Sequence, residues 1–564
     1  MLNELQSAIV NSRTQNLIVS ASPGSGKTTT IVARAAKRLA EIKIRERIAL
    51  ITYTNAAADE ILVKIGENDQ LFIGTIHAFC LGFILKPFGW TLGFPQAKVV
   101  SYEQRKKFFE LNTDINLAGN FGQNRFKELS KIRHNLDGSL NTDVEWDHQI
   151  ALTEVADRYR AFLRSESVIE FEDILIRSYK ILNKHDFVRK SLSVLFREIM
   201  VDEFQDTDEF QYQIMKMIHD IGSTTYIFVG DEKQRIFGFA GAINNAFNRA
   251  VKDFNAIDMP LTEVYRSTNE IVTCYCKLFL DHPKITNSSE FSNEEFSDII
   301  FLETTNKNYN KSIITLLDNL INNIEVSPNE IAILSNSWFD SYNTSKLIRD
   351  KFPLCGQGAL PHPGISNSAY QLFRSMIIFI SKPSMNRMRV IRRNFTNHCL
   401  ENDLVFTEKI TYKKINRLIN QVSQIEEEYP ISNSLVKLKT IFNEGLGCIH
   451  PVFDEIKDLI NEDEIDLWNY KKYTLALNNN EGIRNDTIHK VKGLEFEVVI
   501  LNNMNENKIP RQKLLSRKDW VYQELSEENI ANARTVFYVG CSRPRALLIV
   551  NHNWKPSLFV KEIK

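Results

Sequence analysis

The stretch Ala21-Ser22-Pro23-Gly24-Ser25-Gly26-Lys27-Thr28 organises the rest of the chain. It follows the apolar run Leu17-Ile18-Val19, which predicts a buried strand, and it precedes a helical pattern over residues 29–40. A strand that leads through a glycine loop into a helix presents backbone N–H groups and the positive end of the helix dipole to one anion. The stretch therefore predicts a polyphosphate site on an α/β fold.

Individual residues of this loop have distinct expected roles. Gly24 and Gly26 supply the dihedral angles and the close backbone approach that a bound phosphate needs. Lys27 can reach the β- and γ-phosphates, and Thr28 can bind Mg²⁺. Ala21 stands where the usual phosphate-loop pattern has glycine. The loop thus predicts binding of a nucleoside triphosphate together with Mg²⁺.

Length and charge limit the kinds of protein that the chain can be. Its 564 residues suffice for three to four domains of about 150 residues each. The formal net charge is −1, so no general basic field attracts nucleic acid. A nucleic-acid partner would have to bind in a local groove.

Cysteine spacing and the N-terminus bear on the compartment. The seven cysteines show no repeated C-x-x-C spacing, which argues against the common zinc and iron–sulfur patterns and favours reduced thiols. The N-terminus lacks a basic segment followed by an apolar one, and no apolar run approaches about 18 residues. We expect a cytoplasmic protein with no membrane contact.

An acidic pair follows a second apolar run. Residues 198–201 predict a buried strand that ends at Asp202 and Glu203. Two adjacent carboxylates at the tip of a buried strand repel each other unless a cation lies beside them, and a Mg²⁺-nucleotide supplies one. We expect Asp202 to hold the metal and Glu203 to orient or deprotonate the attacking water.

Polar residues end other predicted strands and leave alternatives open. Tyr53 and His77 follow apolar runs at residues 48–51 and 72–76. Such residues suit sugar-phosphate and base contacts, but polar residues at strand ends elsewhere also cap helices. Gln6 lies about one short helix before the phosphate loop, where its amide can pair with adenine or simply face solvent.

The segment after the strand at residues 226–231 carries three more candidates. Gln234 lies where a polar side chain can sense the γ-phosphate. Phe237 and Phe239 are two residues apart and flank a glycine, so they can act as stacking platforms for bases. Core packing is the alternative for both rings.

Two long segments interrupt the strand pattern. Residues 102–184 and 361–480 are mostly helical and charged, with spaced apolar anchors, and they predict inserted helical subdomains. In the second, four arginines between positions 387 and 393 are candidates to grip a duplex or an acidic partner, although a solvated basic helix face explains them equally well.

Taken together, these stretches resemble the ordered motifs of UvrD/Rep-like superfamily 1A helicases, a family that includes PcrA. The matching segments are residues 21–28, 52–55, 74–77, 201–206, 229–234, 261–267, 487–496 and 538–543. The resemblance covers most of the chain apart from the two helical insertions.

The resemblance implies an α/β fold of two RecA-like parallel-sheet domains (P-loop NTPase) with two inserted helical subdomains. The implied divisions are 1–101 (domain 1A, first part), 102–185 (insertion 1B), 186–260 (domain 1A, second part), 261–360 (domain 2A, first part), 361–480 (a shortened insertion 2B) and 481–564 (domain 2A, second part).

The resemblance also assigns roles to residues, with ATP and Mg²⁺ as the implied ligands. The implied catalytic residues are Lys27, Glu203, Gln234, Arg266 and Arg543, and the implied metal ligands are Thr28 and Asp202. The implied nucleotide-binding residues are Gln6, Ala21, Ser22, Gly24, Ser25, Gly26, Lys27, Thr28, Thr29, Tyr265, Arg266, Glu495 and Arg543. The implied DNA contacts are Tyr53, His77, Phe237, Phe239 and His489.

Two functional hypotheses follow from the resemblance. The first is an ATP-hydrolysing helicase that moves 3′ to 5′ on single-stranded DNA and acts at duplex–single-strand junctions. The second is an ATP-dependent DNA-sensing subunit that regulates an OLD-family nuclease in a Gabija-type antiphage defence system, with little unwinding of its own. Phe239-Ala240 stands where the family usually has Trp-Arg, so ATP hydrolysis is the firmer expectation and processive unwinding the weaker one.

Overall fold

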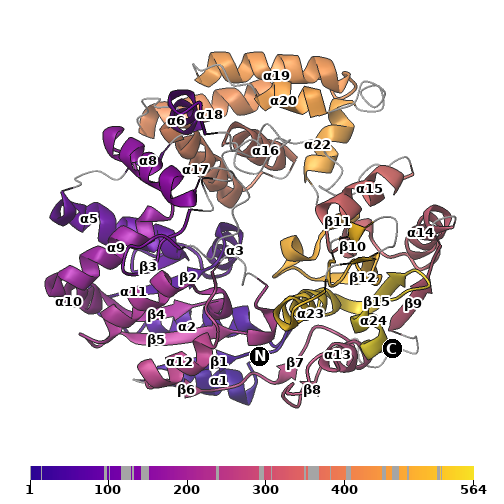
Figure 1. Cartoon of the computed structure of the whole chain (residues 1–564), viewed down its shortest axis with the longest axis horizontal. Helices are drawn as coiled ribbons and strands as arrows, with labels where there is room; N and C mark the ends of the chain where they lie inside the picture. The colour runs from indigo at the N-terminus through magenta and orange to yellow at the C-terminus, as the bar shows by residue number, and fades with distance from the viewer. Residues whose placement is uncertain are drawn as a thin grey trace.

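The structure is a computed structural model. It shows two sheets, each made of parallel strands, that lie side by side (Figure 1). It describes residues 2–13, 16–93, 98–100, 102–115, 129, 132–141, 151–236, 241–290, 298–305, 308–348, 351–352, 368–381, 383–401, 408–446, 452–459, 469–478, 482–512, 514–516, 521–522 and 524–564.

The first sheet holds six parallel strands in the order β3-β2-β4-β5-β1-β6. Their bounds are β1 Leu17–Ser20, β2 Arg47–Thr52, β3 Leu71–Thr75, β4 Phe196–Val201, β5 Thr225–Gly230 and β6 Ile257–Asp258. The helices that belong to this lobe are α1 Glu4–Asn11, α2 Lys27–Leu39, α3 Asn55–Ile65, α4 Ile76–Phe79, α5 Lys86–Phe88, α9 Asp173–Lys184, α10 Asp186–Leu195, α11 Glu209–His219 and α12 Ala246–Asp253. The four inner strands, β1, β2, β4 and β5, are mostly apolar and mostly buried, as expected for a parallel sheet covered on both faces, whereas the edge strands β3 and β6 are partly buried and exposed.

The second sheet holds five parallel strands in the order β11-β10-β12-β15-β9. Their bounds are β9 Ile299–Glu303, β10 Ile331–Ser335, β11 Arg484–Thr487, β12 Phe496–Asn502 and β15 Pro544–His552. The helices of this lobe are α13 Asn269–Cys276, α14 Tyr309–Asp318, α15 Trp338–Ile348, α23 Glu527–Cys541 and α24 Leu558–Ile563. Two short pairs, β7 Glu263–Val264 with β8 Thr286–Asn287 and β13 Leu514–Ser516 with β14 Val521–Tyr522, lie outside both sheets.

The helical insertions have cores of their own. Helices α6 (Tyr102–Leu111) and α8 (Leu152–Ser165) contribute to one cluster of buried side chains. The second insertion forms a separate helical layer above the lobes in Figure 1. Its helices are α16 Ser368–Ser381, α17 Met385–Glu401, α18 Glu408–Ser423, α19 Ile431–Leu446, α20 Val452–Leu459 and α22 Tyr470–Asn478. The expected fold class, two parallel α/β lobes with helical insertions, is therefore confirmed.

Two details differ from the expectation. Helix α9 was expected in the first insertion, but Ile174, Leu175 and Ile181 pack into the core of the first sheet. Strand β11 was not expected because its sequence, Arg-Asn-Asp-Thr, is polar. It is nevertheless buried, since Asn485 exchanges hydrogen bonds with Ser341 on α15 at 2.9 and 3.2 Å.

The arginines of α17 contact protein. Arg393 makes a two-pronged ion pair with Asp59 of α3 at 3.3 and 3.2 Å, and Arg389 pairs with Glu67 at 2.5 Å. These contacts join the second insertion to the first lobe. Within the described ranges, no helix combines the length and the apolar character needed to cross a bilayer.

Candidate nucleotide site between the two lobes

The phosphate loop joins β1 to α2 and has the backbone shape that its sequence predicts. Gly24 and Gly26 have φ of 75° and 80°, in the left-handed region that favours glycine. Gly26 is the N-cap of α2, and no side chain caps the helix there. The first N–H groups of α2 therefore remain available to an anion. Lys27, the first residue of α2, extends back over the loop, and its Nζ donates to the carbonyl of Ala21 at 3.4 Å.

Gln6 lies directly against the loop. Its Nε2 donates to the carbonyl of Ser25 at 3.2 Å, and a Cβ on Gly26 would lie only 2.6 Å from that nitrogen. Asn3 caps α1 and turns toward the second lobe, where its Nδ2 donates to the hydroxyl of Tyr265 at 2.7 Å. Gln6 and Tyr265, both expected to bind the nucleotide, are thus linked to the loop through one end of α1.

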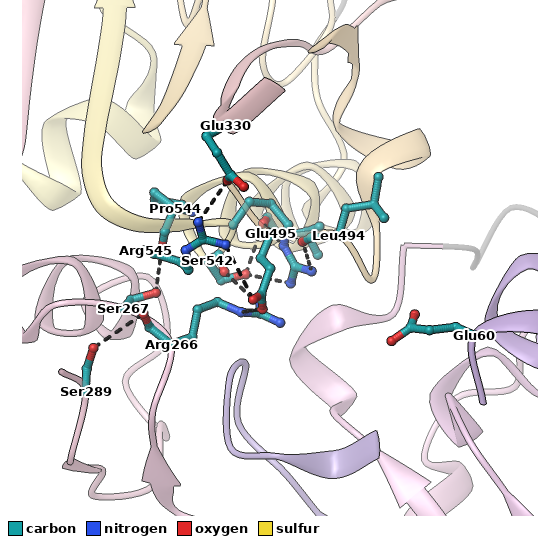
Figure 2. Close-up of polar contacts among 12 residues, drawn as sticks. Glu60, Arg266, Ser267, Ser289, Glu330, Leu494, Glu495, Ser542, Pro544 and Arg545 are labelled. Atoms are coloured by element: carbon teal, nitrogen blue, oxygen red, sulfur yellow. Dashed lines mark hydrogen bonds and ion pairs between the residues drawn. The ribbon is translucent and has the colours of Figure 1, made fainter. Parts of the chain in front are cut away.

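Arg266 packs against the loop at Gly24. A Cβ on Gly24 would lie 2.5 Å from the Cβ of Arg266, and the N–H of Tyr265 donates to the carbonyl of Gly24 at 3.0 Å. Only glycine fits here, because both the space and the positive φ exclude a side chain. Glu495 accepts from Nε of Arg266 at 2.7 Å and lies 3.7 Å from Arg545, so it is held between two guanidinium groups (Figure 2).

The acidic pair lies at the end of β4. Burial and the neighbouring carboxylate of Glu203 raise the pKa of Asp202. Burial also tends to raise the pKa of Glu203. The ammonium groups of Lys492 and Lys27 have the larger effect, and they hold the pKa of Glu203 below its usual range. Glu203 has φ of 54°, a left-handed conformation that is uncommon for a residue with a side chain and that recurs at functional sites.

Lys492 was not among the residues predicted for this site. Its Nζ lies 3.4 Å from Glu203, contacts Asp206, and donates to the carbonyl of Gln234 at 2.9 Å. A lysine of the second lobe therefore pairs with the carboxylates of the first. Its position three residues before Glu495, inside a recognised motif, was the available signal, but the pattern does not indicate where the side chain points.

Arg543 and Gln234 join the lobes at a second point. Arg543 is only 2% exposed, and its Nη2 donates to Oε1 of Gln234 at 3.0 Å. Gln234 in turn donates to Asp231 at 2.8 Å. Burial, and then the positive charge of Arg266, lowers the pKa of Arg543 to about 9, so this guanidinium lies where a nearby negative charge would stabilise it.

The residues around the phosphate loop fit a Mg²⁺-nucleotide. The hydroxyl Oγ of Ser25 is buried inside the phosphate loop without a hydrogen-bond partner, although buried polar groups normally have one. Burial, and then the carboxylate of Glu203, raise the pKa of Asp202, and a dication beside the pair would favour its ionised form. Lys27, Arg266 and Arg543 supply cationic groups around the loop. A triphosphate would supply the missing partner of Ser25 and negative charge for the three cationic groups, and a dication would offset the two adjacent carboxylates.

The residues expected to contact DNA are only partly described. Tyr53 follows β2 and is about one-third exposed, and burial together with Asp206 raises its pKa to about 12. His77 follows β3, and its ring stacks on Phe171 with centroids 4.2 Å apart. Burial lowers the pKa of His77 to about 4. The neighbouring hydroxyls act as helix caps, since Thr54 accepts from the third residue of α3 and Thr75 from the third residue of α4.

His489 lies in the second lobe just after β11, and burial lowers its pKa as well. It is separated from β11 by one residue, Ile488, which is fully buried. The remaining two expected contacts, Phe237 and Phe239, lie outside the described residues. The three described residues of this group all follow the carboxyl ends of strands. Tyr53 and His77 do so in the first sheet, and His489 in the second.

Comparison with known proteins adds an independent line of evidence. The model of the UvrD/REP helicase N-terminal domain matches residues 2–255, and the model of the UvrD-like helicase C-terminal domain matches residues 381–554. The two matches reach into both lobes and contain the phosphate loop, the acidic pair and Arg543, and residues 256–380 lie between them.

Full-length relatives agree with the family models. A probable DNA helicase II homolog of Mycoplasma genitalium is 24% identical, and the alignment covers 100% of this chain and 87% of the relative's length. DNA helicase II of Rickettsia typhi is 23% identical, with 96% and 90% covered, and ATP-dependent DNA helicase Rep of Buchnera aphidicola is 21% identical, with 95% and 90% covered. With both family models matched in order and relatives aligned along nearly the whole chain, this protein belongs to the UvrD/Rep-like helicase family.

Proposed function

We propose that this protein is an ATP-dependent DNA helicase of the UvrD/Rep type that moves 3′ to 5′ along single-stranded DNA and acts at duplex–single-strand junctions. Family membership supports the helicase class, and the direction rests on the family resemblance. The observation that carries the proposal is that side chains from both lobes meet around one phosphate loop. Arg266 packs on Gly24, Arg543 bonds to Gln234, and Lys492 pairs with Glu203.

This arrangement lets nucleotide chemistry control lobe movement. Arginines that reach a γ-phosphate from one lobe, while Lys27 holds it from the other, bind most strongly when the lobes are closed. Loss of the γ-phosphate weakens that attraction and favours opening. A lobe that closes and opens once in each turnover can advance along a strand bound across both lobes.

The chain's own residues have separate parts in hydrolysis. Thr28 and Asp202 would hold Mg²⁺, which when bound neutralises charge that develops on the phosphate oxygens. Glu203, kept ionised by Lys492 and Lys27, would orient the attacking water and accept its proton. Gln234 links this centre to Arg543.

A second candidate is the DNA-sensing subunit of an antiphage defence complex that regulates an OLD-family nuclease. Phe239-Ala240, in place of the family's usual Trp-Arg, favours it, because the missing guanidinium is expected to weaken the link between the DNA track and the ATP cleft. This candidate predicts hydrolysis that responds to DNA with little strand separation.

The test compares ATP hydrolysis with and without single-stranded DNA and then measures strand separation on duplexes with a 3′ or a 5′ tail. Strong stimulation together with unwinding of the 3′-tailed duplex supports the helicase proposal. Stimulation without unwinding, combined with co-purification of a nuclease from the native host, supports the sensing subunit. Hydrolysis that single-stranded DNA leaves unchanged would contradict both.

A further inference from the structure

An exposed aromatic cluster opens helix α15 in the second lobe. Trp338 and Phe339, the first two residues of that helix, are 49% and 64% exposed. The Trp338 ring stacks on Tyr342 one turn later, with centroids 5.1 Å apart and an angle of 20° between the ring planes. Tyr342 covers part of the indole, and about half of the Trp338 side chain remains accessible to a ligand.

The cluster lies at the edge of the sheet that carries His489. Strands β10 and β11 are parallel neighbours with Ser335 opposite Thr487. Trp338 is three residues beyond Ser335, and His489 is two residues beyond Thr487. Both segments therefore leave the sheet at adjacent points on its carboxyl edge.

The beginning of α15 is fixed in place by polar contacts. Asp340 accepts from Ser337 at 2.7 Å and from Lys508 at 2.9 Å, and Asn336 donates to the carbonyl of Lys508 at 2.7 Å. These bonds tie the aromatic cluster to the segment that follows β12. They also bring the ammonium group of Lys508 to Asp340, the residue that follows Phe339.

We infer that Trp338, with Phe339 beside it, is a base-stacking platform for single-stranded DNA on the second lobe. Exposed aromatic rings next to basic side chains bind unpaired bases, whose faces are apolar and whose phosphates are anionic. The first lobe has a similar construction, since Phe171, 49% exposed, stacks on His77 just beyond β3. The inference rests on the proposed function, because it requires that single-stranded DNA cross the second lobe.

A purely structural explanation makes a different prediction. Aromatic side chains at positions i and i+4 can stabilise a helix by contacting each other. In that case, replacing the Trp338 ring would affect folding, and its effect on DNA affinity would not depend on which base is present. Coupling between the protein ring and one base therefore separates the two explanations.

The experiment measures the affinity of the full chain for oligo-dT by fluorescence anisotropy. Trp338→Ala is expected to weaken binding by about tenfold through loss of a stacked base, whereas Trp338→Phe should retain most of the affinity. The matched control is Trp90→Ala, because Trp90 is 63% exposed and follows α5 of the first lobe. Helix α5 lies far from α15 in Figure 1. The Trp90→Ala variant should bind oligo-dT with the same affinity as the unaltered chain.

A series of oligonucleotides, each with one abasic nucleotide, completes the test. In the unaltered chain, one abasic position should weaken binding by about as much as Trp338→Ala does, and in the Trp338→Ala variant that position should no longer matter. Equal affinity of the two proteins, or unchanged sensitivity to every abasic position, overturns the platform while leaving the proposed function intact. Failure of the unaltered chain to bind oligo-dT overturns both.

Discussion

Replacing Lys492 by Met tests whether contact between the lobes controls hydrolysis. The substitution keeps the length and apolar stem of the side chain and removes its charge. Lys492 is 9% exposed, and its two carboxylate partners Asp206 and Glu203 are 0% and 20% exposed. Removing one member of a buried ionic group costs about 3–5 kcal/mol, because the remaining charge loses its partner in a poorly solvated place.

The effect on turnover follows from that cost. Because Lys492 is the strongest influence that lowers the pKa of Glu203, its loss raises that pKa and disturbs the proposed water-positioning group. If the closed arrangement loses about 3 kcal/mol, DNA-stimulated turnover falls by about a hundredfold or more. Steady-state ATP hydrolysis at saturating oligo-dT measures the fall, and denaturant unfolding shows whether the variant remains folded.

The control lies two residues away. Lys490 is 31% exposed and 3.4 Å from Asp486 of the same lobe, so Lys490→Met removes a charge without breaking a contact between the lobes. We expect its turnover to stay within about threefold of the unaltered chain. Equal losses in the two variants, or near-normal turnover in a folded Lys492→Met protein, would refute the proposed coupling through Lys492.

Three further changes test stability and lobe contacts. Arg34→Met should lower the free energy of unfolding by about 3–5 kcal/mol, because Arg34 and Glu198 are 1% and 3% exposed and share a two-pronged ion pair; a chemical denaturation curve matching the unaltered chain would contradict this. Burial raises the pKa of Asp208 to about 6. Protonated Asp208 therefore contributes most to the stability of the folded protein at low pH, and this contribution is lost as the pH rises through 6. Asp208→Asn keeps the helix cap without the charge and should gain about 1–3 kcal/mol over the unaltered chain at pH 8 but almost nothing at pH 4, by thermal unfolding at each pH. Arg393→Glu should loosen the second insertion from the first lobe, and adding Asp59→Arg should restore the contact, as followed by energy transfer between dyes on α17 and α3; an unchanged distance in the single variant would show that the pair does not hold the insertion.

Local pattern was enough to predict strands β1 to β5 of the first sheet and their order along the chain. Apolar runs such as residues 198–201 and 226–229 are long, rich in Ile and Val, and followed by polar residues, so burial and strand ends are both visible in the sequence. Strand β11 escaped prediction because Asn485 and Asp486 are polar yet fully buried. Their burial depends on partners from α15 and neighbouring segments that no local pattern reveals.

The candidate site also contains residues that local motifs predict and contacts that they do not. Lys27, Asp202 and Glu203 were predictable because each follows a buried strand within a short, specific motif. The ion pair between Lys492 and Glu203 was not, since the two residues are far apart in sequence and belong to different lobes. The same limit applied to the arginines of α17, whose acidic partners Asp59 and Glu67 lie more than three hundred residues away.

The segment from Thr487 to Phe496 connects the two proposed ligand sites. It leaves the carboxyl edge of the second sheet at β11, where His489 lies, and returns to the opposite edge at β12 beside Glu495. Lys492 stands between them and contacts the acidic pair. Because Ile488 and Val491 are fully buried, this short helical segment is anchored in the core and can transmit displacement from one end to the other. On the predicted contact between His489 and DNA, movement of the bound DNA would shift Lys492 relative to Glu203, so we propose this segment as a mechanical route from DNA to the proposed catalytic residues.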